Sequence, residues 1–465
     1  MKVALIRCRV ETGARETNVT GIYPPLGLAY LAAALRAQGV DVCIVDAEAL
    51  GLASKDLLAE IPADTDVIGF TATTLLWPTV RKLSFEARRL FHRSLLVVGG
   101  PHVTAFPREC LAGSAFDVGV MGDGEDTLCR IVEQWTAHHD VTDVAGCAVR
   151  ERDRIAINGR PQVIDDLDRL PFPALDLLPM DRYRSVMVRM PFSTIVTSRG
   201  CPFRCAFCSQ VYSDWQWHAR SPGSIVDEME RNVRQFGSRE LVLFDETFGV
   251  KREDALEVCR QIVARNLKVR WNARSRVDVL DEPLLRAMWG AGCHALHFGI
   301  EAGTQRVLDM MQKKITLQQV KSVSEMARQI GFTLHGYFML GYPDETRAEM
   351  METIRFARQL PLDWASFTVA TPAPMTPLVE IACERGLMPR HYWQAYTVGR
   401  DVAATPFFPG PDRGPGELKR IKNEAYLQFY LRPRTLARNL FFLIRVGGMS
   451  RLLSAGLYWL RELLR

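Results

Sequence analysis

The chain has 465 residues, of which 48% are hydrophobic and 24% are charged, and its formal net charge is +5. Its length exceeds that of one ordinary domain and its composition is that of a folded globular protein, so a disordered chain is excluded. The net charge is small, and no run of Lys and Arg with interleaved aromatic residues occurs, which argues against a nucleic-acid partner.

The N-terminus begins MKVALIRCRVET, whose apolar run is too short for a signal peptide. No stretch of about 18 apolar residues occurs that would span a bilayer. We therefore expect a cytoplasmic protein whose eleven cysteines are reduced. Eight of these cysteines are scattered singly, and we expect them to be small buried hydrophobic residues.

Short Val- and Ile-rich runs alternate with helical patterns from the N-terminus to about Glu133. The predicted strands cover residues 3–9, 41–47, 67–73, 94–100 and 117–123. Strands joined by crossover helices predict a doubly wound, flavodoxin- or Rossmann-like α/β domain at 1–140, in which ligands bind beyond the carboxyl ends of the strands. Those ends carry small and polar candidates for ligand binding: Thr71, Thr73, Gly99, Gly100, His102, Gly122, Gly124 and Glu125.

A second alternation of strands and helices follows a connector. Residues 141–190 contain a predicted hairpin, CAVRERDRIAING, and a Pro/Asp-rich stretch that prolines keep extended. Further strands are predicted near residues 193–199, 240–246, 269–275, 294–300, 333–340 and 364–371. These βα units predict a partial (β/α)6 barrel over residues 191–400, with its site at the carboxyl ends of the strands.

Residues 401–465 change to a helical pattern that ends in LARNLFFLIRVGGMSRLLSAGLYWLRELLR. A basic amphipathic tail of this kind can lie on a membrane surface. The alternative is an ordinary pair of helices packed on the barrel, which we favour.

Three cysteines, Cys201, Cys205 and Cys208, lie together in a loop directly after the first predicted strand of the barrel. Four thiolates would complete an iron–sulfur cubane, whereas three leave one iron open to bind a reacting molecule. A zinc site with His218 as its fourth ligand and three unrelated cysteines are the alternatives. The spacing, the position at a strand end and the aromatic Phe207 before the last thiol favour the cluster.

The CxxxCxxC motif in this position resembles that of the radical S-adenosylmethionine (SAM) superfamily, and the resemblance extends over about residues 190–400. It implies a [4Fe-4S] cluster whose open iron chelates SAM. It further implies cleavage of SAM to a 5′-deoxyadenosyl radical by an electron from a donor such as flavodoxin or ferredoxin.

Two further segments resemble SAM-binding motifs of that family. FDETF, at 244–248, offers Asp245 and Glu246 for the SAM ammonium group, although two aspartates are the more usual pair. WNARSRVD, at 271–278, offers Arg274 or Arg276 for the SAM carboxylate by bidentate hydrogen bonding.

Two motifs in later strands complete the likeness. HFGIEAGTQRVLDMM, at 297–311, places Glu301 near the ribose hydroxyls. LGYPDET, at 340–346, places Gly341 in the turn that flanks the adenine, with Asp344 where the common form has Gly.

The first domain resembles the cobalamin-binding domain of one large subclass of the superfamily. The matching segments are residues 23–47, 98–104, 122–127 and 166–173. The chain contains no Asp-x-His motif, so cobalt is expected to lack a protein imidazole on its lower face, and His102 is expected to form a wall of the pocket. A flavodoxin-like domain that binds another nucleotide, or nothing, is the alternative.

The resemblance implies a cobalamin-dependent radical SAM enzyme that methylates an unactivated carbon of a small molecule. A second interpretation keeps the cofactors but performs an oxidative ring closure or rearrangement, and a third is a non-catalytic cobalamin or redox sensor. The aromatic loop after the cysteines (Tyr212, Trp215, Trp217) and the basic, apolar C-terminal region suggest a hydrophobic, polycyclic substrate such as a hopanoid, a tetrapyrrole or a polyketide.

Overall fold

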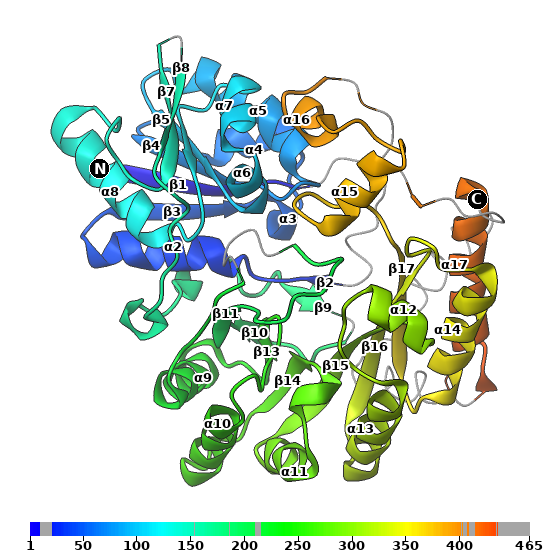
Figure 1. Cartoon of the computed structure of the whole chain (residues 1–465). Helices are drawn as coiled ribbons and strands as arrows, with labels where there is room; N and C mark the ends of the chain where they lie inside the picture. Colours follow the sequence, from blue (N-terminus) through cyan, green and yellow to red (C-terminus); the bar gives the residue numbers. More distant parts are fainter. Residues whose placement is uncertain are drawn as a thin grey trace.

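The computed structural model of the chain contains two large sheets, one beside the other (Figure 1). It describes residues 1–9, 21–152, 154–185, 187–209, 215–400, 402, 407–408, 414–433 and 435. The N-terminal sheet and its helices (blue to cyan in Figure 1) lie above the carboxyl ends of the second sheet (green to yellow). This placement sets the ends of both sets of parallel strands toward each other.

The N-terminal sheet is mostly parallel. Its strands are β1 (Lys2–Arg7), β3 (Asp41–Asp46), β4 (Val67–Thr71), β5 (Leu95–Gly99), β6 (Val118–Val120), β7 (Cys147–Glu151) and β8 (Arg154–Asn158). Their order in the sheet is β3-β1-β4-β5-β6-β7-β8. The first five are parallel to their neighbours, which confirms the predicted doubly wound α/β fold.

The predicted hairpin forms, but it extends the N-terminal sheet instead of standing apart in the connector. Strand β7 pairs antiparallel with β6, and β8 pairs antiparallel with β7. The rest of the connector contains the short ribbon of β2 (Gly21–Ile22) and β9 (Arg184–Ser185) and the 3-10 turns η2 (Leu167–Arg169) and η3 (Leu175–Leu177).

Helices cover both faces of the N-terminal sheet because its central strands are apolar on both sides. One face packs on α2 (Leu26–Ala37) and α8 (Glu125–His138), through residues such as Leu28 and Ile131. The other face packs on α5 (Trp77–Leu90), α6 (Pro101–Ala105) and α7 (Pro107–Ala112), through residues such as Trp77 and Leu111. Three shorter elements, α3 (Ala47–Leu50), α4 (Ser54–Leu57) and η1 (Leu58–Glu60), follow β3.

The second sheet is a six-stranded, fully parallel partial barrel, as predicted. Its strands are β10 (Phe192–Ile195), β13 (Glu240–Leu243), β14 (Arg270–Ser275), β15 (Cys293–Glu301), β16 (Thr333–Leu340) and β17 (Trp364–Val369), paired in that order. Its main helices are α9 (Pro222–Phe236), α10 (Arg252–Ala264), α11 (Glu282–Gly290), α12 (Gln305–Met310), α13 (Leu317–Ile330) and α14 (Arg347–Gln359). Between them lie the ribbon of β11 (Ser198–Gly200) and β12 (Trp217–Ala219) and the turn η4 (Val277–Val279).

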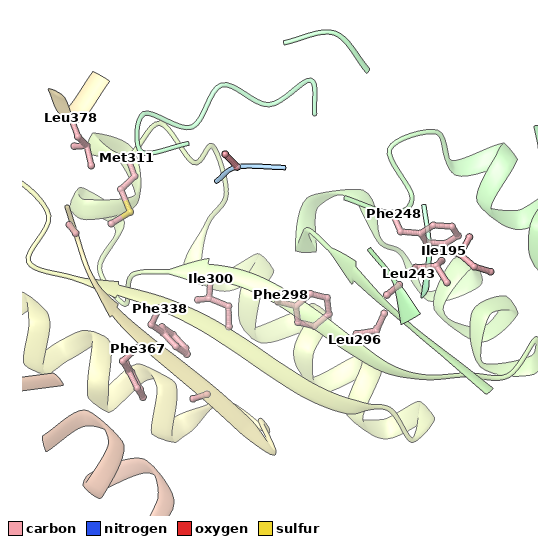
Figure 2. Packing of buried hydrophobic residues seen from close by; sticks show 14 of the residues in the cluster. Ile195, Leu243, Phe248, Leu296, Phe298, Ile300, Met311, Phe338, Phe367 and Leu378 are labelled. Atoms are coloured by element: carbon pink, nitrogen blue, oxygen red, sulfur yellow. The ribbon is translucent and has the colours of Figure 1, made fainter. Parts of the chain in front are cut away.

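Side chains alternate along the barrel strands between the helices and the interior of the barrel. Figure 2 shows Leu296, Phe298 and Ile300 following one another along β15, and all three are fully buried in the helix-facing core. The alternate residue His297 and, on the neighbouring strand, Tyr337 face the interior, where they line a cavity. The barrel is therefore packed on its outside and keeps polar groups inside.

The C-terminal elements join the two sheets and close the barrel edge. They are α15 (Pro377–Glu384), α16 (Tyr392–Thr397) and α17 (Pro415–Tyr430). The hydroxyl of Tyr430 accepts from the backbone N–H of Ala365 and donates to its carbonyl, at 3.1 and 2.9 Å, and so occupies the free edge of β17.

The prediction of a membrane-lying tail concerns residues that fall mostly outside the described ones, which end at residue 435. Within the part of the chain that the structure describes, no helix is both long and apolar enough to cross a membrane.

Candidate functional site

The three motif cysteines lie in one loop, residues 198–209, which we call the cysteine loop. It begins directly after β10, so it stands at the carboxyl end of the first barrel strand. Cys201 and Cys205 are 8% and 7% exposed, Cys208 is half-buried, and none of the three forms a disulfide. The backbone N–H of Cys208 donates to the carbonyl of Cys205 at 3.1 Å, which fixes the turn between the last two thiols.

Asp245 fastens the start of the cysteine loop. Its buried carboxylate accepts the backbone N–H groups of Thr197 and Ser198, at 2.7 and 2.8 Å, and the hydroxyl of Thr197 at 2.6 Å. Burial raises the pKa of this carboxyl, and these hydrogen bonds oppose the rise. The oxygens of Asp245 are therefore used within the protein, and its contact with SAM stays a prediction, whereas the next residue, Glu246, is exposed.

Arg276 holds the loop from the other side. Its guanidinium is buried, donates to the Sγ of Cys205 at 3.5 Å and to the carbonyl of Lys313 at 2.7 Å, and forms two 2.9 Å hydrogen bonds with Asp278. Arg276 therefore ties the residues that follow β14 to the cysteine loop.

A buried ion pair stands next to the aromatic residue of the cysteine loop. The Nζ of Lys313 lies 3.2 Å from the Oε1 of Glu301 and 5.7 Å from the ring centre of Phe207. Gly299 leaves room for this pair, because a Cβ there would come within 2.5 Å of the Glu301 Oε1. Glu301 itself ends β15 in the left-handed region, with φ of 70°.

The turn after β16 is built around one buried carboxylate. Glu345 accepts the backbone N–H groups of Gly341 and Tyr342 at 2.6 and 2.9 Å. Asp344 has φ of 61°, a conformation that favours Gly, and its carboxylate pairs with Arg385 at 2.7 Å. The departure from Gly at this position therefore keeps the shape of the turn.

A cavity of about 350 Å³ lies between the two sheets, and we call it the interdomain cavity. Its inner part is apolar and enters the N-terminal sheet between Leu5, Leu28 and Val97. Gly27 belongs to this wall, and a Cβ there would meet no atom within 4 Å. The polar residues and glycines that line its mouth are Thr71, Gly99, Gly100, Gly122, Asp123, Gly124, Glu125, Ser198, Arg199, Gly200, Ser209 and Glu246.

Arg199 connects the N-terminal domain to the cysteine loop at the mouth of this cavity. Its Nη1 lies 2.9 Å from the Oδ1 of Asp123, and its Nη2 lies 2.5 Å from the Oε1 of Glu125. The guanidinium also lies over the ring of Tyr30, 5.4 Å from its centre. Both carboxylates come from the Gly122–Glu125 turn of the first domain, and Arg199 stands two residues before Cys201.

Two family models match the chain where these two halves lie. The model of the B12 binding domain matches residues 15–132, and the model of the radical SAM superfamily matches residues 195–357. An uncharacterized methyltransferase of Pyrococcus horikoshii is 34% identical over 448 residues, which cover 95% of each chain.

The chain belongs to the cobalamin-binding radical SAM family. Its cofactors are a [4Fe-4S] cluster, SAM and cobalamin. It is also similar to the anaerobic magnesium-protoporphyrin IX monomethyl ester cyclase of Rubrivivax gelatinosus, with 31% identity over 391 residues that cover 82% of this chain and 70% of the relative.

Solved structures share the arrangement of the two domains. The radical S-adenosylmethionine methyltransferase TsrM from Kitasatospora setae, with cobalamin and a [4Fe-4S] cluster bound, matches with a TM-score of 0.70 at 20% identity, covering 82% of this chain and 78% of that one. The cobalamin-dependent S-adenosylmethionine radical enzyme OxsB matches with a TM-score of 0.72 at 17% identity, covering 98% of this chain and 72% of that one.

The residues present fit these cofactors. Three cysteines in one loop supply the thiolate donors that a [4Fe-4S] cluster takes, and a set of three leaves one iron without a protein ligand. His218, the alternative fourth ligand of a zinc site, is hydrogen-bonded to Gln216. For cobalamin, the interdomain cavity offers a cradle at the strand ends of the first domain, and at Gly27 in its wall a Cβ would meet no protein atom within 4 Å.

The structure separates the predicted residues of the first domain into two groups. Thr71, Gly99 and Gly100 line the interdomain cavity, as do Gly122, Gly124 and Glu125, although the carboxylate of Glu125 is held by Arg199. Thr73 does not line this cavity; it is exposed, and its hydroxyl accepts the backbone N–H of Leu76 at 3.3 Å within a local turn.

His102 is not part of the pocket wall, which corrects the prediction. It is 1% exposed, with Nδ1 3.2 Å from the hydroxyl of Thr74 and Nε2 3.1 Å from that of Thr397 in α16. Helix α6 turns the ring away from the strand ends and into the contact with the C-terminal elements. Among the described lining residues of the interdomain cavity there is no histidine.

The two arginines proposed for the SAM carboxylate lie in different surroundings. Arg276 touches the cysteine loop, whereas Arg274 lies within β14 and lines a second cavity inside the barrel. Sequence reasoning did not identify Arg199 or Lys313, because their partners are remote in the sequence or lie on another element. Six of the eight scattered cysteines are buried, as expected for hydrophobic residues.

Replacing Asp245 with Ala tests the anchor of the cysteine loop. Three donors lose their acceptor, at a cost of about 1–3 kcal/mol each, so we expect the loop to open and the iron bound per chain after anaerobic reconstitution to fall. Asp227→Ala is the control, because that carboxylate is 55% exposed and pairs with Arg265. Unchanged iron content in a folded Asp245→Ala variant would contradict this role.

His102 gives a pH dependence of stability. Burial lowers its pKa from 6.5 to about 4, so the unfolded chain binds a proton at higher pH than the folded chain does. Stability is therefore lost as pH falls from about 6.5 toward 4, by about 2 kcal/mol between pH 7 and pH 5.

Urea unfolding at the two pH values measures this loss. His102→Gln should reduce the difference between them by that amount, whereas His391→Gln, at an exposed position, should leave it unchanged. A His102→Gln variant with the pH dependence of the wild type would disprove the assignment.

Proposed function

We propose that the chain is a C-methyltransferase that acts on an unactivated carbon of a small molecule. The observation that carries the proposal is that one cavity is lined both by the strand ends of the cobalamin-binding domain and by the cysteine loop. The relative from Pyrococcus horikoshii, whose name is that of a methyltransferase, supports it across both domains.

Residues on the barrel side would hold the cluster and SAM. Cys201, Cys205 and Cys208 would bind three irons, with the guanidinium of Arg276 donating to the Sγ of Cys205. Glu246 is exposed into the interdomain cavity and would take the SAM ammonium group in place of Asp245.

Three further contacts to SAM belong to the proposal. Arg276 would be the candidate for its carboxylate, although Asp278 already occupies two of its donors. Glu301 would reach the ribose only by sharing its carboxylate with Lys313, and the backbone at Gly341 would flank the adenine. Phe207 would cover one side of the cluster.

Thr71, Gly99 and Gly100, which line the interdomain cavity, would hold cobalamin at the strand ends of the first domain. When bound, the cluster and SAM supply a carbon radical by hydrogen abstraction, and cobalamin supplies the methyl group. The protein's own part is to exclude water and to hold both cofactors at one cavity.

The oxidative cyclase is the second candidate, and the 31% identity to the Rubrivivax gelatinosus enzyme favours it. It would use the same cavity and the same cysteines but would not transfer a methyl group. A flavodoxin or ferredoxin would supply the electron in either case. The proposed membrane contact of the C-terminal region falls mostly on residues outside the described ones.

The products formed from SAM distinguish the two candidates. The full chain is reconstituted anaerobically with iron, sulfide and cobalamin, then reduced and given SAM. A methyltransferase should form both 5′-deoxyadenosine and S-adenosylhomocysteine, because remethylation of cobalamin uses a second SAM. Deoxyadenosine without S-adenosylhomocysteine would contradict the methyltransferase and favour the cyclase.

A cysteine variant supplies the matched control. Cys208→Ala should abolish 5′-deoxyadenosine formation and the absorbance of the cluster while cobalamin still binds. Cys383→Ala replaces a half-buried thiol outside the cysteine loop. This variant should retain 5′-deoxyadenosine formation and the absorbance of the cluster.

A further inference from the structure

A second cavity, of about 270 Å³, lies inside the barrel, and we call it the lumen cavity. It is formed by the inward-facing residues of β13 to β17 and closed by the segment around the β2–β9 ribbon. Its lining residues are Tyr23, Met187, Val188, Val242, Phe244, Asn272, Arg274, His294, Ala295, Leu296, His297, Thr333, His335, Tyr337, Trp364 and Ser366.

One wall of the lumen cavity is a set of stacked rings. His335 and Tyr337 lie 4.5 Å apart with an interplanar angle of 28°, and His297 and Tyr337 lie 6.1 Å apart at 22°. The Nδ1 of His297 lies 3.2 Å from the Tyr337 hydroxyl, and the Nε2 of His335 lies 2.9 Å from the Ser366 hydroxyl. Burial lowers the pKa of both histidines, that of His335 to about 3, so this wall is neutral.

The buried Nδ1 of His335 has no hydrogen-bond partner among the described residues. A buried polar atom without a partner is costly, and a bound molecule that supplies one removes the cost.

Arg274 provides the positive charge of the lumen cavity. Its guanidinium lies over Phe244, 4.5 Å from the ring centre, and beside Tyr337, whose burial-raised pKa it partly lowers. In the described part of the chain no carboxylate pairs with it, whereas Arg276 pairs with Asp278.

Glu240, a carboxylate that contacts two lining residues of the lumen cavity, is already engaged. Glu240 lies 2.8 Å from the Nε2 of His294 and 3.1 Å from the amide of Asn272, and it also accepts the backbone N–H of Arg189. It is therefore not the counterion of Arg274. A half-buried guanidinium that lines a cavity without an anion is suited to bind one from a ligand.

We propose that the lumen cavity binds the substrate and that Arg274 holds an anionic group of it, a carboxylate or a phosphate. This inference rests on the proposed function, since it assigns the molecule on which the cofactors act. The stacked wall of His297, His335 and Tyr337 would lie against a planar part of that molecule.

Phe244 relates this site to the cofactors. It lines both the lumen cavity and the interdomain cavity, so a molecule held by Arg274 lies directly beside the space assigned to cobalamin and SAM. The volume of about 270 Å³ is near the lower limit for small-ligand pockets. The inference therefore replaces the expected hydrophobic, polycyclic substrate with a small anionic one.

Binding of three matched probes to the reconstituted full chain tests the inference. Benzoate and phenyl phosphate each carry a ring and an anionic group, whereas benzamide is a neutral analogue of benzoate. We expect saturable binding by ligand-observed NMR for at least one of the anions, at least about tenfold tighter than for benzamide. Preference for benzoate assigns a carboxylate, and preference for phenyl phosphate assigns a phosphate.

Arg274→Gln should weaken binding of the preferred anion by at least about tenfold, while the affinity for SAM, the cluster absorbance and bound cobalamin stay within about twofold of the wild type. Arg286→Gln is the control, because Arg286 is exposed and pairs with Glu282 on the outside of the barrel. Equal binding of benzamide and both anions by the wild type would overturn the inference. Loss of SAM affinity in Arg274→Gln with retained anion binding would also overturn the inference. It would instead support Arg274 as the residue that binds the SAM carboxylate.

Neither outcome depends on the products formed from SAM. The probe experiment can therefore fail while methyl transfer is observed, and the product experiment can fail while the anion still binds.

Discussion

The ion pairs of Arg199 with Asp123 and Glu125 join the two halves of the site. The arginine belongs to the ribbon that begins the cysteine loop, and the carboxylates belong to the turn after β6 in the cobalamin-binding domain. Glu125 is 4% exposed, and burial of its charge without this partner would destabilise the folded protein. The contact ties the cysteine loop to the glycine-rich strand ends, and both line the interdomain cavity.

Side chains alternate along each barrel strand, so that one set packs in the hydrophobic core and the other set carries the polar groups of the barrel interior. Residues such as Phe298 and Phe338 are buried against the helices, and they make the outer core (Figure 2). The alternate residues carry imidazole, phenol and guanidinium groups into the interior. Past the ends of the strands, Arg276 and the Glu301–Lys313 pair surround the cysteine loop instead. The residues inside the barrel are thus the ones proposed to bind an anionic substrate, and the residues past the strand ends are the ones proposed to bind the cofactors.

The sequence predicts the parts of this fold that depend on local pattern. Short apolar runs alternating with helical patterns located all eleven parallel strands of the two sheets to within a few residues, because those runs are bounded by turns and helices. The CxxxCxxC spacing identified the cysteine loop, since three thiols in one short loop are typical of a metal-binding or catalytic site.

Contacts between distant segments could not be predicted in this way. Asp245 and Glu246 are neighbours of the same charge, and only the path of the chain shows that the first turns toward Thr197 while the second faces the interdomain cavity. His102 pairs with a hydroxyl 295 residues later, which no local signal reveals. Arg274 and Arg276 share a side of the strand, but the end of β14 falls between them and separates their roles.

The most direct test of the account is the magnetic coupling between cob(II)alamin and the reduced cluster in the reconstituted full chain, measured by electron paramagnetic resonance. If the Arg199 contact holds both cofactors at one cavity, the wild type should show a cob(II)alamin signal split by the nearby cluster, and Arg199→Gln should lose the splitting while still binding both cofactors. An unsplit signal in a fully loaded wild type would contradict the shared cavity, and unchanged splitting in the variant would contradict the role given to Arg199.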